Sequence, residues 1–219
     1  AAAGLANAQH NLALAYHLGD GVALDYSKSE KWFRKAAEQG HVDAQYNLGF
    51  MYRNGDVVLQ DFKEAVNWYR KAAEQGYVKA QFNLSLMYNG GEGVPQSYEE
   101  AANWYSKAAK QGHAGAQHNL ALMYCEGEGV PKDYGLAINW LRLAAEQGLA
   151  AAQSDLGVMY ENGFGVESNT VLSHMWGNIA GSNGSELGAE NRKRLEPTMS
   201  QSQIVQAQNL AKKLIQIHG

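Results

Sequence analysis

Apolar residues recur along this chain at a fixed distance of 36 residues, without an insertion between one occurrence and the next. Leucine, tyrosine, valine and tryptophan each return five times at their own phase, as does an Ala-Gln pair. The tryptophans, for example, are Trp32, Trp68, Trp104, Trp140 and Trp176. A period of this length indicates a repeated supersecondary unit that cannot bury its apolar face alone.

The first half of each unit predicts a helix. In the second unit, Ala44, Leu48 and Tyr52 are spaced i, i+4 and i+8, which places them on one face of an α-helix. Asn54-Gly55 is a breaker pair that predicts the end of this helix.

The second half predicts another helix after a short loop. Asp61 followed by Glu64 is the pattern of a capping box and predicts the start. Gly76 suits a left-handed cap at the end. Stacking such helix pairs buries a continuous apolar face, so we predict an all-α fold, a right-handed α-solenoid.

The period also predicts the domain organisation. Residues 1–4 match the last turn of a second helix and are expected to be a remnant of a preceding helix. The repeat domain covers 5–184, and its five units in register are 8–43, 44–79, 80–115, 116–151 and 152–187. Residues 185–219 depart from the period and are expected to form C-terminal capping helices.

Within this cap, Glu186 to Leu195 predicts one helix, which Pro197 would end. A last helix is predicted from Ser200, with apolar residues on one face and polar residues on the other. The basic run Arg192-Lys193-Arg194 is interpreted as a solvated face rather than a nucleic-acid patch.

Composition narrows the function classes. The chain has 219 residues, 45% of them hydrophobic, which is enough for a core. Its formal net charge of -4 gives no reason to expect a nucleic-acid partner. We find no apolar run of the length that a membrane span needs. The single cysteine, Cys125, excludes an internal disulfide.

Two strings carry a resemblance to a known family: Ala-Gln-Tyr-Asn-Leu-Gly-Phe-Met-Tyr-Arg-Asn-Gly at 44–55 and Trp-Tyr-Arg-Lys-Ala-Ala-Glu-Gln-Gly at 68–76. The loop strings Gly-Glu-Gly-Val-Pro at 91–95 and 127–131 agree with it. The chain resembles Sel-one-like repeat (SLR) proteins, which are similar to tetratricopeptide repeats with a longer loop between the helices. The resemblance implies a scaffold or adaptor that binds other proteins, without naming a partner.

The resemblance also bears on activity and location. One subgroup of the family has a cysteine pair in each repeat and is labelled penicillin-hydrolysing, and this chain departs from it because it has no such pairs. No Ser-x-x-Lys or Gly-x-Ser-x-Gly motif is present, so we predict no enzyme. The habits of the family favour an exported protein, periplasmic or secreted, and a cytoplasmic one stays open.

Other residues that suggest chemistry have a simpler interpretation. The tryptophans lie among alanines at helical spacing, so we expect them in the core. His118 and Cys125 can share one helix face, but two ligands without a third make a poor metal site. We predict no metal and no cofactor.

The surface of the first helices is the predicted binding site. The tetratricopeptide resemblance implies that these helices line the concave side. The positions facing this groove vary from unit to unit while the packing positions do not, which is what a partner-specific surface needs. The candidates are His10, Leu14, His17, Asp43, Tyr46, Phe50, Arg53, Lys79, Phe82, Leu86, Asn89, His118 and Leu122.

A row of carboxamides runs through the same helices: Asn11, Asn47, Asn83 and Asn119, with Asp155 last. Asn47, Asn83 and Asn119 join the candidate site. Such a row can hold the backbone of an extended peptide, or it can bond neighbouring helices. Two alternatives to peptide binding stay open. The groove aromatics can stack on sugar rings of a carbohydrate or host surface, and the uncapped N-terminal end can self-associate.

Overall fold

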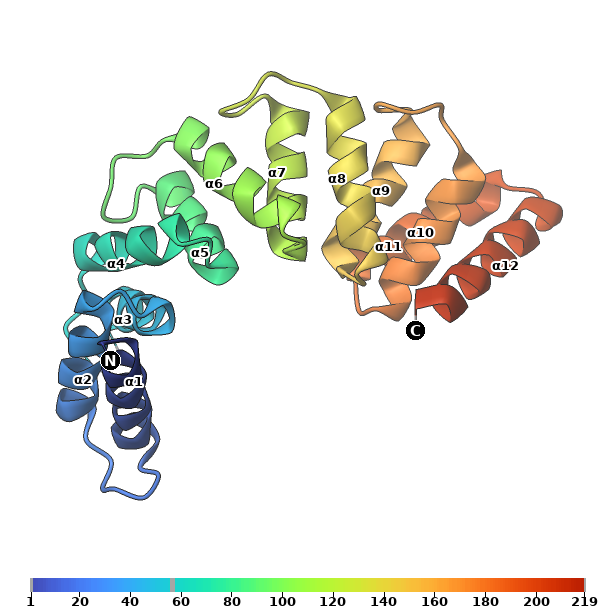
Figure 1. The fold of residues 1–219 in the computed structure, drawn as a ribbon. Helices are drawn as coiled ribbons and strands as arrows, with labels where there is room; N and C mark the ends of the chain where they lie inside the picture. Colours follow the sequence, from blue (N-terminus) through green and yellow to red (C-terminus); the bar gives the residue numbers. More distant parts are fainter. Residues whose placement is uncertain (1, 56–57, 219) are drawn as a thin grey trace. The chain divides into compact units, whose positions relative to one another are not determined.

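The computed structural model describes residues 2–55 and 58–218. Within these residues the chain is entirely helical and has no strand (Figure 1). The helices are α1 (Ala2–Leu18), α2 (Tyr26–Glu38), α3 (Val42–Asn54), α4 (Phe62–Glu74), α5 (Val78–Gly90), α6 (Tyr98–Lys110), α7 (Ala114–Glu126), α8 (Tyr134–Glu146), α9 (Ala150–Asn162), α10 (Thr170–Ser182), α11 (Glu186–Leu195), the 3-10 helix η1 (Glu196–Thr198) and α12 (Gln201–His218).

The paired helices α1 and α2, α3 and α4, α7 and α8, and α9 and α10 pack on each other. Helix α2 also packs on α3, α4 on α5 and α8 on α9, so the predicted all-α solenoid is confirmed. The chain divides into two compact units, unit 1 (1–108) and unit 2 (109–219), each with its own core. Residues 2–4 were expected to be a remnant of a preceding helix. They form the first turn of α1.

Local signals in the sequence explain where the helices begin and end. The Asp61 carboxylate accepts the N–H groups of Lys63 and Glu64 at 2.9 and 3.1 Å, which caps α4. Gly55 follows α3 with φ of 75°, and Gly76 follows α4 with φ of 88°. Both are left-handed conformations that only glycine adopts at low cost, so the predicted helix ends are confirmed.

The second glycine of the loop between two paired helices has a different role. A Cβ atom at Gly93 would lie 2.3 Å from the carbonyl oxygen of Phe62, and one at Gly165 would lie 2.4 Å from that of Tyr134. Each loop therefore packs directly on the start of the preceding second helix. A side chain at these positions would push the two repeats apart.

The periodic apolar residues form the core. Leu48 and Leu84 in unit 1, like Leu156 in unit 2, are fully buried. Trp68, Trp104 and Trp176 are buried as predicted. The other two tryptophans are half-buried.

The glutamine of the Ala-Gln pair joins consecutive repeats, a role that the sequence reasoning missed. Gln45 is buried, and its side chain donates to the Ala37 carbonyl oxygen of the preceding second helix at 3.0 Å. Its own Oε1 accepts from Gln75 at 2.7 Å. Unit 2 repeats the pattern: the Gln153 side chain donates to the Ala145 carbonyl oxygen at 2.9 Å. A buried amide satisfied on both sides fixes the register of stacking.

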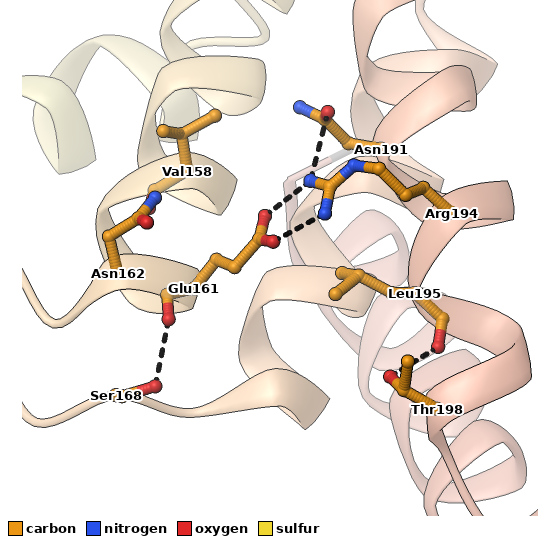
Figure 2. A network of polar contacts seen from close by, with 8 residues as sticks. All are labelled: Val158, Glu161, Asn162, Ser168, Asn191, Arg194, Leu195 and Thr198. Atoms are coloured by element: carbon orange, nitrogen blue, oxygen red, sulfur yellow. Dashed lines mark hydrogen bonds and ion pairs between the residues drawn. The ribbon is translucent and has the colours of Figure 1, made fainter.

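The residues expected to form the cap belong to unit 2, and α11 spans Glu186–Leu195, the range predicted for this helix. Two of the three residues in its basic run also make contacts with the last repeat. Arg194 makes a bidentate pair with Glu161 of α9, with both N–O distances 2.6 Å (Figure 2). Arg192 donates to the Asn178 side chain of α10 at 3.0 Å. These arginines attach the cap to the last repeat, and Lys193 is exposed.

Candidate functional site

The predicted binding residues lie on the first helices, and none of them is fully buried. Most of them belong to unit 1 and lie on its first helices, α1, α3 and α5. His118, Asn119 and Leu122 belong to α7 of unit 2. Because the two units are separate compact bodies, the candidates form two surfaces, which we describe one at a time.

A pocket of about 260 Å³ opens between α1, α2 and α3 of unit 1. Five of its seven lining residues are predicted site residues. The lining consists of Leu14, His17, Phe33, Tyr46, Asn47, Phe50 and Met51. Sequence reasoning missed Phe33 and Met51, because both occupy packing positions of the repeat and both are mostly buried. No signal in the sequence distinguishes their pocket-facing edges.

Aromatic rings form one wall of this pocket. The Tyr46 ring lies 6.5 Å from that of Phe50, 5.8 Å from that of Tyr69 and 5.1 Å from that of Tyr77, measured between ring centroids. Tyr46 is half-buried among them. Phe50 is 48% exposed, which is unusual for a side chain of its size. The cluster holds Tyr46 in place and leaves the Phe50 ring free to contact another molecule.

The polar side of the pocket is fixed by contacts between repeats. Asn47 Nδ2 lies 3.4 Å from His10 Nε2, and the His10 ring stacks on that of His41 with centroids 4.4 Å apart. Burial, followed by the nearby His41, lowers the pKa of His10. A neutral His10 offers Nε2 as the acceptor that orients the Asn47 amide.

The same contact recurs in unit 2 with another residue pair. His118 of α7 lies with Nε2 2.7 Å from an Asp155 carboxylate oxygen of α9. The carboxamide row thus bonds side chains of the neighbouring repeat at both places, which supports its structural interpretation. Nearby, burial and the carboxylates of Asp155 and Glu126 raise the pKa of the Cys125 thiol. In the described part of the chain, no three His, Cys, Asp or Glu side chains gather as a metal site would need.

Charge differs between the two surfaces. The first helices of unit 1 carry Arg53, Lys79 and Asp43, two cations against one carboxylate, for a net +1. Arg53 pairs with Glu92 of the α5–α6 loop at 3.3 Å. Asp43 accepts a hydrogen bond from the Tyr77 hydroxyl; burial and this bond raise the pKa of Tyr77 to about 12. Lys79 is exposed.

In unit 2, helices α7 and α9 carry three carboxylates and no cation: Glu126, Asp155 and Glu161. One of them, Glu161, is already bound by Arg194 of the cap. We find no helix among the described residues with the length and apolarity needed to cross a membrane.

These features define an α-solenoid of two-helix repeats, with a pocket between α1, α2 and α3 of unit 1. The Sel1 repeat model matches residues 6–41, 42–77, 78–113, 114–149 and 150–185. The chain belongs to the Sel1 repeat family, as the resemblance predicted. None of the curated proteins matches the chain.

Solved structures agree with this assignment. A Sel1 repeat protein from Oxalobacter formigenes is 34% identical with a TM-score of 0.80, over 84% of this chain and 76% of that one. The SLR-fold protein c5321, a protective antigen of uropathogenic Escherichia coli strains, is 34% identical with a TM-score of 0.60. That match covers 97% of this chain, which spans only 54% of the antigen. The immunity protein PA5088 from Pseudomonas aeruginosa, 21% identical over 96% of this chain and 82% of that one, shares the fold, with a TM-score of 0.50.

Proposed function

We propose that the chain is a non-catalytic scaffold that binds a peptide or protein segment on the first helices of its repeats. Its principal site is the pocket of unit 1. The repeat fold is consistent with protein partners in general, and the site within it is our proposal.

The observation that carries the proposal is that five residues chosen from the sequence alone also line one pocket of the structure. Tyr46 and Phe50, like Leu14 and His17, were selected because their positions vary between repeats, and Asn47 was selected as a member of the carboxamide row. The pocket then groups all five on one side of unit 1. An exposed aromatic beside a half-buried aromatic and a polar amide is the composition of an interaction hot spot.

The chemistry of the pocket supports binding rather than catalysis. Its lining carries no carboxylate, lysine or arginine, and its polar groups are the His17 imidazole, the Tyr46 hydroxyl and the Asn47 amide. General acid–base catalysis and nucleophilic catalysis both need a second polar group within hydrogen-bond reach of the first. Shape and apolar contact are what this site offers.

The test is affinity capture followed by measurement with the purified partner. The Phe50→Asp variant is compared with Leu143→Asp, which places the same charge on α8 of unit 2, at a side chain that is 45% exposed. We expect Phe50→Asp to abolish binding and Leu143→Asp to retain it, with both variants folded by circular dichroism.

Two results would contradict the proposal. If a purified partner binds both variants equally, the site lies away from the first helices of unit 1. If no protein binds but a glycan array gives a signal that Phe50→Asp removes, the surface recognises carbohydrate.

A further inference from the structure

We infer that a second pocket, in unit 2, receives a lysine side chain of a partner protein. The pocket lies where α8, α10 and α12 end, and not on the first helices of unit 1. The inference therefore goes beyond the proposed function and does not rest on it. It follows from the lining of the pocket, from the charges around it and from the way the repeat fills the corresponding place in unit 1.

The pocket has a volume of about 300 Å³ and is built at one end of unit 2. Helices α8, α10 and α12 all run towards this end (Figure 1), and most of the lining comes from their last two turns and the residues that follow. Trp176 and Ile179 of α10 and Leu214 and Ile215 of α12 give the pocket an apolar wall. The volume is at the lower limit of small-molecule sites and suits one long side chain.

The repeat shows what fills this place when the chain itself supplies the occupant. In unit 1, each tryptophan of a second helix is followed three residues later by a lysine. The lysine Nζ atoms lie 4.2, 4.1 and 3.7 Å from the ring centroids in the pairs Trp32–Lys35, Trp68–Lys71 and Trp104–Lys107. These are cation–π contacts.

Unit 2 has no lysine at this position of its repeats. Leu143 follows Trp140, and Ile179 follows Trp176. Both Trp176 and Ile179 line the pocket. The pocket is therefore a place where the repeat elsewhere holds an ammonium group and where this chain leaves that group to be supplied by another molecule.

The charge around the pocket favours such a cation. Glu146 is the last residue of α8 and is exposed, and among the described lining residues it is the only charged one. No ion pair between described residues engages it. The C-terminal ends of three helices add partial negative charge, against one N-terminus, that of α9. Lys212 and Lys213 of α12 line other hollows of the surface.

The apolar wall suits the rest of a lysine side chain. Its methylene groups can pack on Ile179 and Leu214 while the ammonium stays beside the Glu146 carboxylate. A neutral apolar side chain would use the wall and leave the carboxylate unpaired. A carboxylate of a partner would be repelled by Glu146 and by the helix ends.

Two side-chain amides favour a lysine in a peptide over a free amine. Asn183 donates to Gln153 at 2.9 Å. Gln147 donates to Gln117 at 2.7 Å. Asn183 and Gln147 are exposed in the lining of the pocket. Because their N–H groups are used within unit 2, their carbonyl oxygens remain as acceptors for backbone N–H groups, which a peptide has and an alkylamine lacks.

The inference is tested by NMR titration of the full chain labelled with ¹⁵N. The probes are the peptides Ac-Ala-Ala-Xaa-Ala-Ala-NH2, with lysine, Nε-acetyl-lysine, norleucine or glutamate at Xaa, and n-butylammonium chloride. The indole signal of Trp176 and the backbone amides of 145–148 report the site. We expect the lysine peptide to bind at least about three-fold more tightly than the acetyl-lysine and norleucine peptides, from the ion pair and the ring contact. It should also bind more tightly than n-butylammonium, and added salt should weaken it.

Two exposed positions locate the effect. Glu146→Gln should weaken the lysine peptide about two- to five-fold, whereas Glu126→Gln, the same change at the end of α7, should leave it unchanged. Ile215→Lys places an ammonium in the lining and should weaken the peptide by a similar factor. Val205→Lys, on the same helix but outside the lining, should not. The two side chains are 48% and 44% exposed, so both variants are expected to fold.

Several results would overturn the inference. Equal binding of the lysine and acetyl-lysine peptides would show that the ammonium has no part in recognition. Equal binding of n-butylammonium would show that the ligand is a free amine and not a protein. An unchanged affinity in Glu146→Gln, or no saturable shift of the pocket signals with the lysine peptide, would also contradict it. None of these results bears on the unit 1 site, which Phe50→Asp tests separately.

Discussion

Units 1 and 2 use the same repeat, yet their first helices present different surfaces. In unit 1 they carry exposed and half-buried aromatic rings around an open pocket, with a net charge of +1. In unit 2 the charged side chains of helices α7 and α9 are all carboxylates. One of them, that of Glu161, is bound by Arg194 of the cap (Figure 2). One unit leaves its first helices available, and the other uses part of them to hold the end of the solenoid.

The difference teaches which positions of the repeat are fixed by stacking. Both units keep the buried leucine, the bridging glutamine and the left-handed glycines, because these residues hold one repeat on the next. The variable positions do not hold one repeat on the next, so their residues can differ between the two units. The predictions below test how far the two units are alike and where they diverge.

The largest effect is expected from truncation of the shared core. Leu84→Ala in unit 1 and Leu156→Ala in unit 2 each remove a fully buried side chain. Both should lower the free energy of unfolding by about 2–5 kcal/mol, as core truncations do. Urea denaturation followed by circular dichroism measures the loss. A loss below about 1 kcal/mol at either position would show that the two cores are not equivalent.

The next effect comes from the loop glycines. Gly165→Ala adds a Cβ atom 2.4 Å from the Tyr134 carbonyl oxygen at a φ of 71°, whereas Gly148→Ala adds one at a φ of 86° with nothing within 4 Å. The control, Gly148→Ala, should lower the free energy of unfolding by about 1–2 kcal/mol, because alanine is strained in the left-handed conformation. Gly165→Ala should cost clearly more in thermal unfolding. Gly93→Ala against Gly76→Ala repeats the experiment in unit 1, and equal losses within a pair would contradict the close approach.

Acid should affect the two units in different pH ranges. The pKa of His10 is lowered in the folded state, so the unfolded chain takes up this proton first. The stability that neutral His10 confers on unit 1 is therefore complete above about 6.5 and is lost as the pH falls below it. The protection factors of amides in α1 and α3, which correct for the intrinsic pH dependence of exchange, should fall from pH 7.5 to pH 5.5, and His10→Asn should remove most of this dependence. An unchanged dependence in the variant would argue against the role of His10.

In unit 2 the relevant group is a carboxylate. The hydrogen bonds from Arg194 lower the pKa of Glu161, so its contribution is complete above the ordinary glutamate pKa of about 4.3 and is lost as the pH falls through the lowered value. The protection factors of amides in α11 should be the same at pH 5.5 as at neutral pH and should fall at more acidic pH or at high salt. Glu161→Gln should lower them already at neutral pH. The same protection in variant and wild type would show that the ion pair does not hold the cap.

The smallest effect on stability is expected at the proposed site. Phe50 and Leu143 are both exposed, so replacing either by Ala should change the free energy of unfolding by no more than about 0.5 kcal/mol. Melting temperatures measure this. A large loss for Phe50→Ala would mean that its ring supports the fold of unit 1 and is not free for a partner.

The sequence predicted most of the fold because its signals are local and repeated. The breaker pair at Gly55, the cap at Asp61 and the helix from Glu186 to Leu195 each depend on residues within a few positions of each other, and the structure confirms them. Contacts between repeats were harder to predict from the sequence. Glu161 and Arg194 are 33 positions apart, and neither position belongs to a pattern that would link them.

The candidate site was predicted in part for the same reason. Variable positions on the first helices identified Tyr46 and Phe50, because a departure from the repeat is visible in the sequence. The pocket itself depends on how α1, α2 and α3 pack, because its lining residues come from all three helices. Packing positions such as Phe33 show no departure from an apolar pattern, so their contribution became visible only in three dimensions.

The most direct test of the difference between the units is photo-crosslinking from matched positions. A benzoylphenylalanine is placed at Phe50 in one variant and at Val158, the corresponding residue three repeats later in α9, in another. We predict that a protein partner, identified by mass spectrometry, is crosslinked from position 50 and is not crosslinked from position 158. Crosslinking from position 158 alone, or equally from both, would contradict the assignment of binding to unit 1.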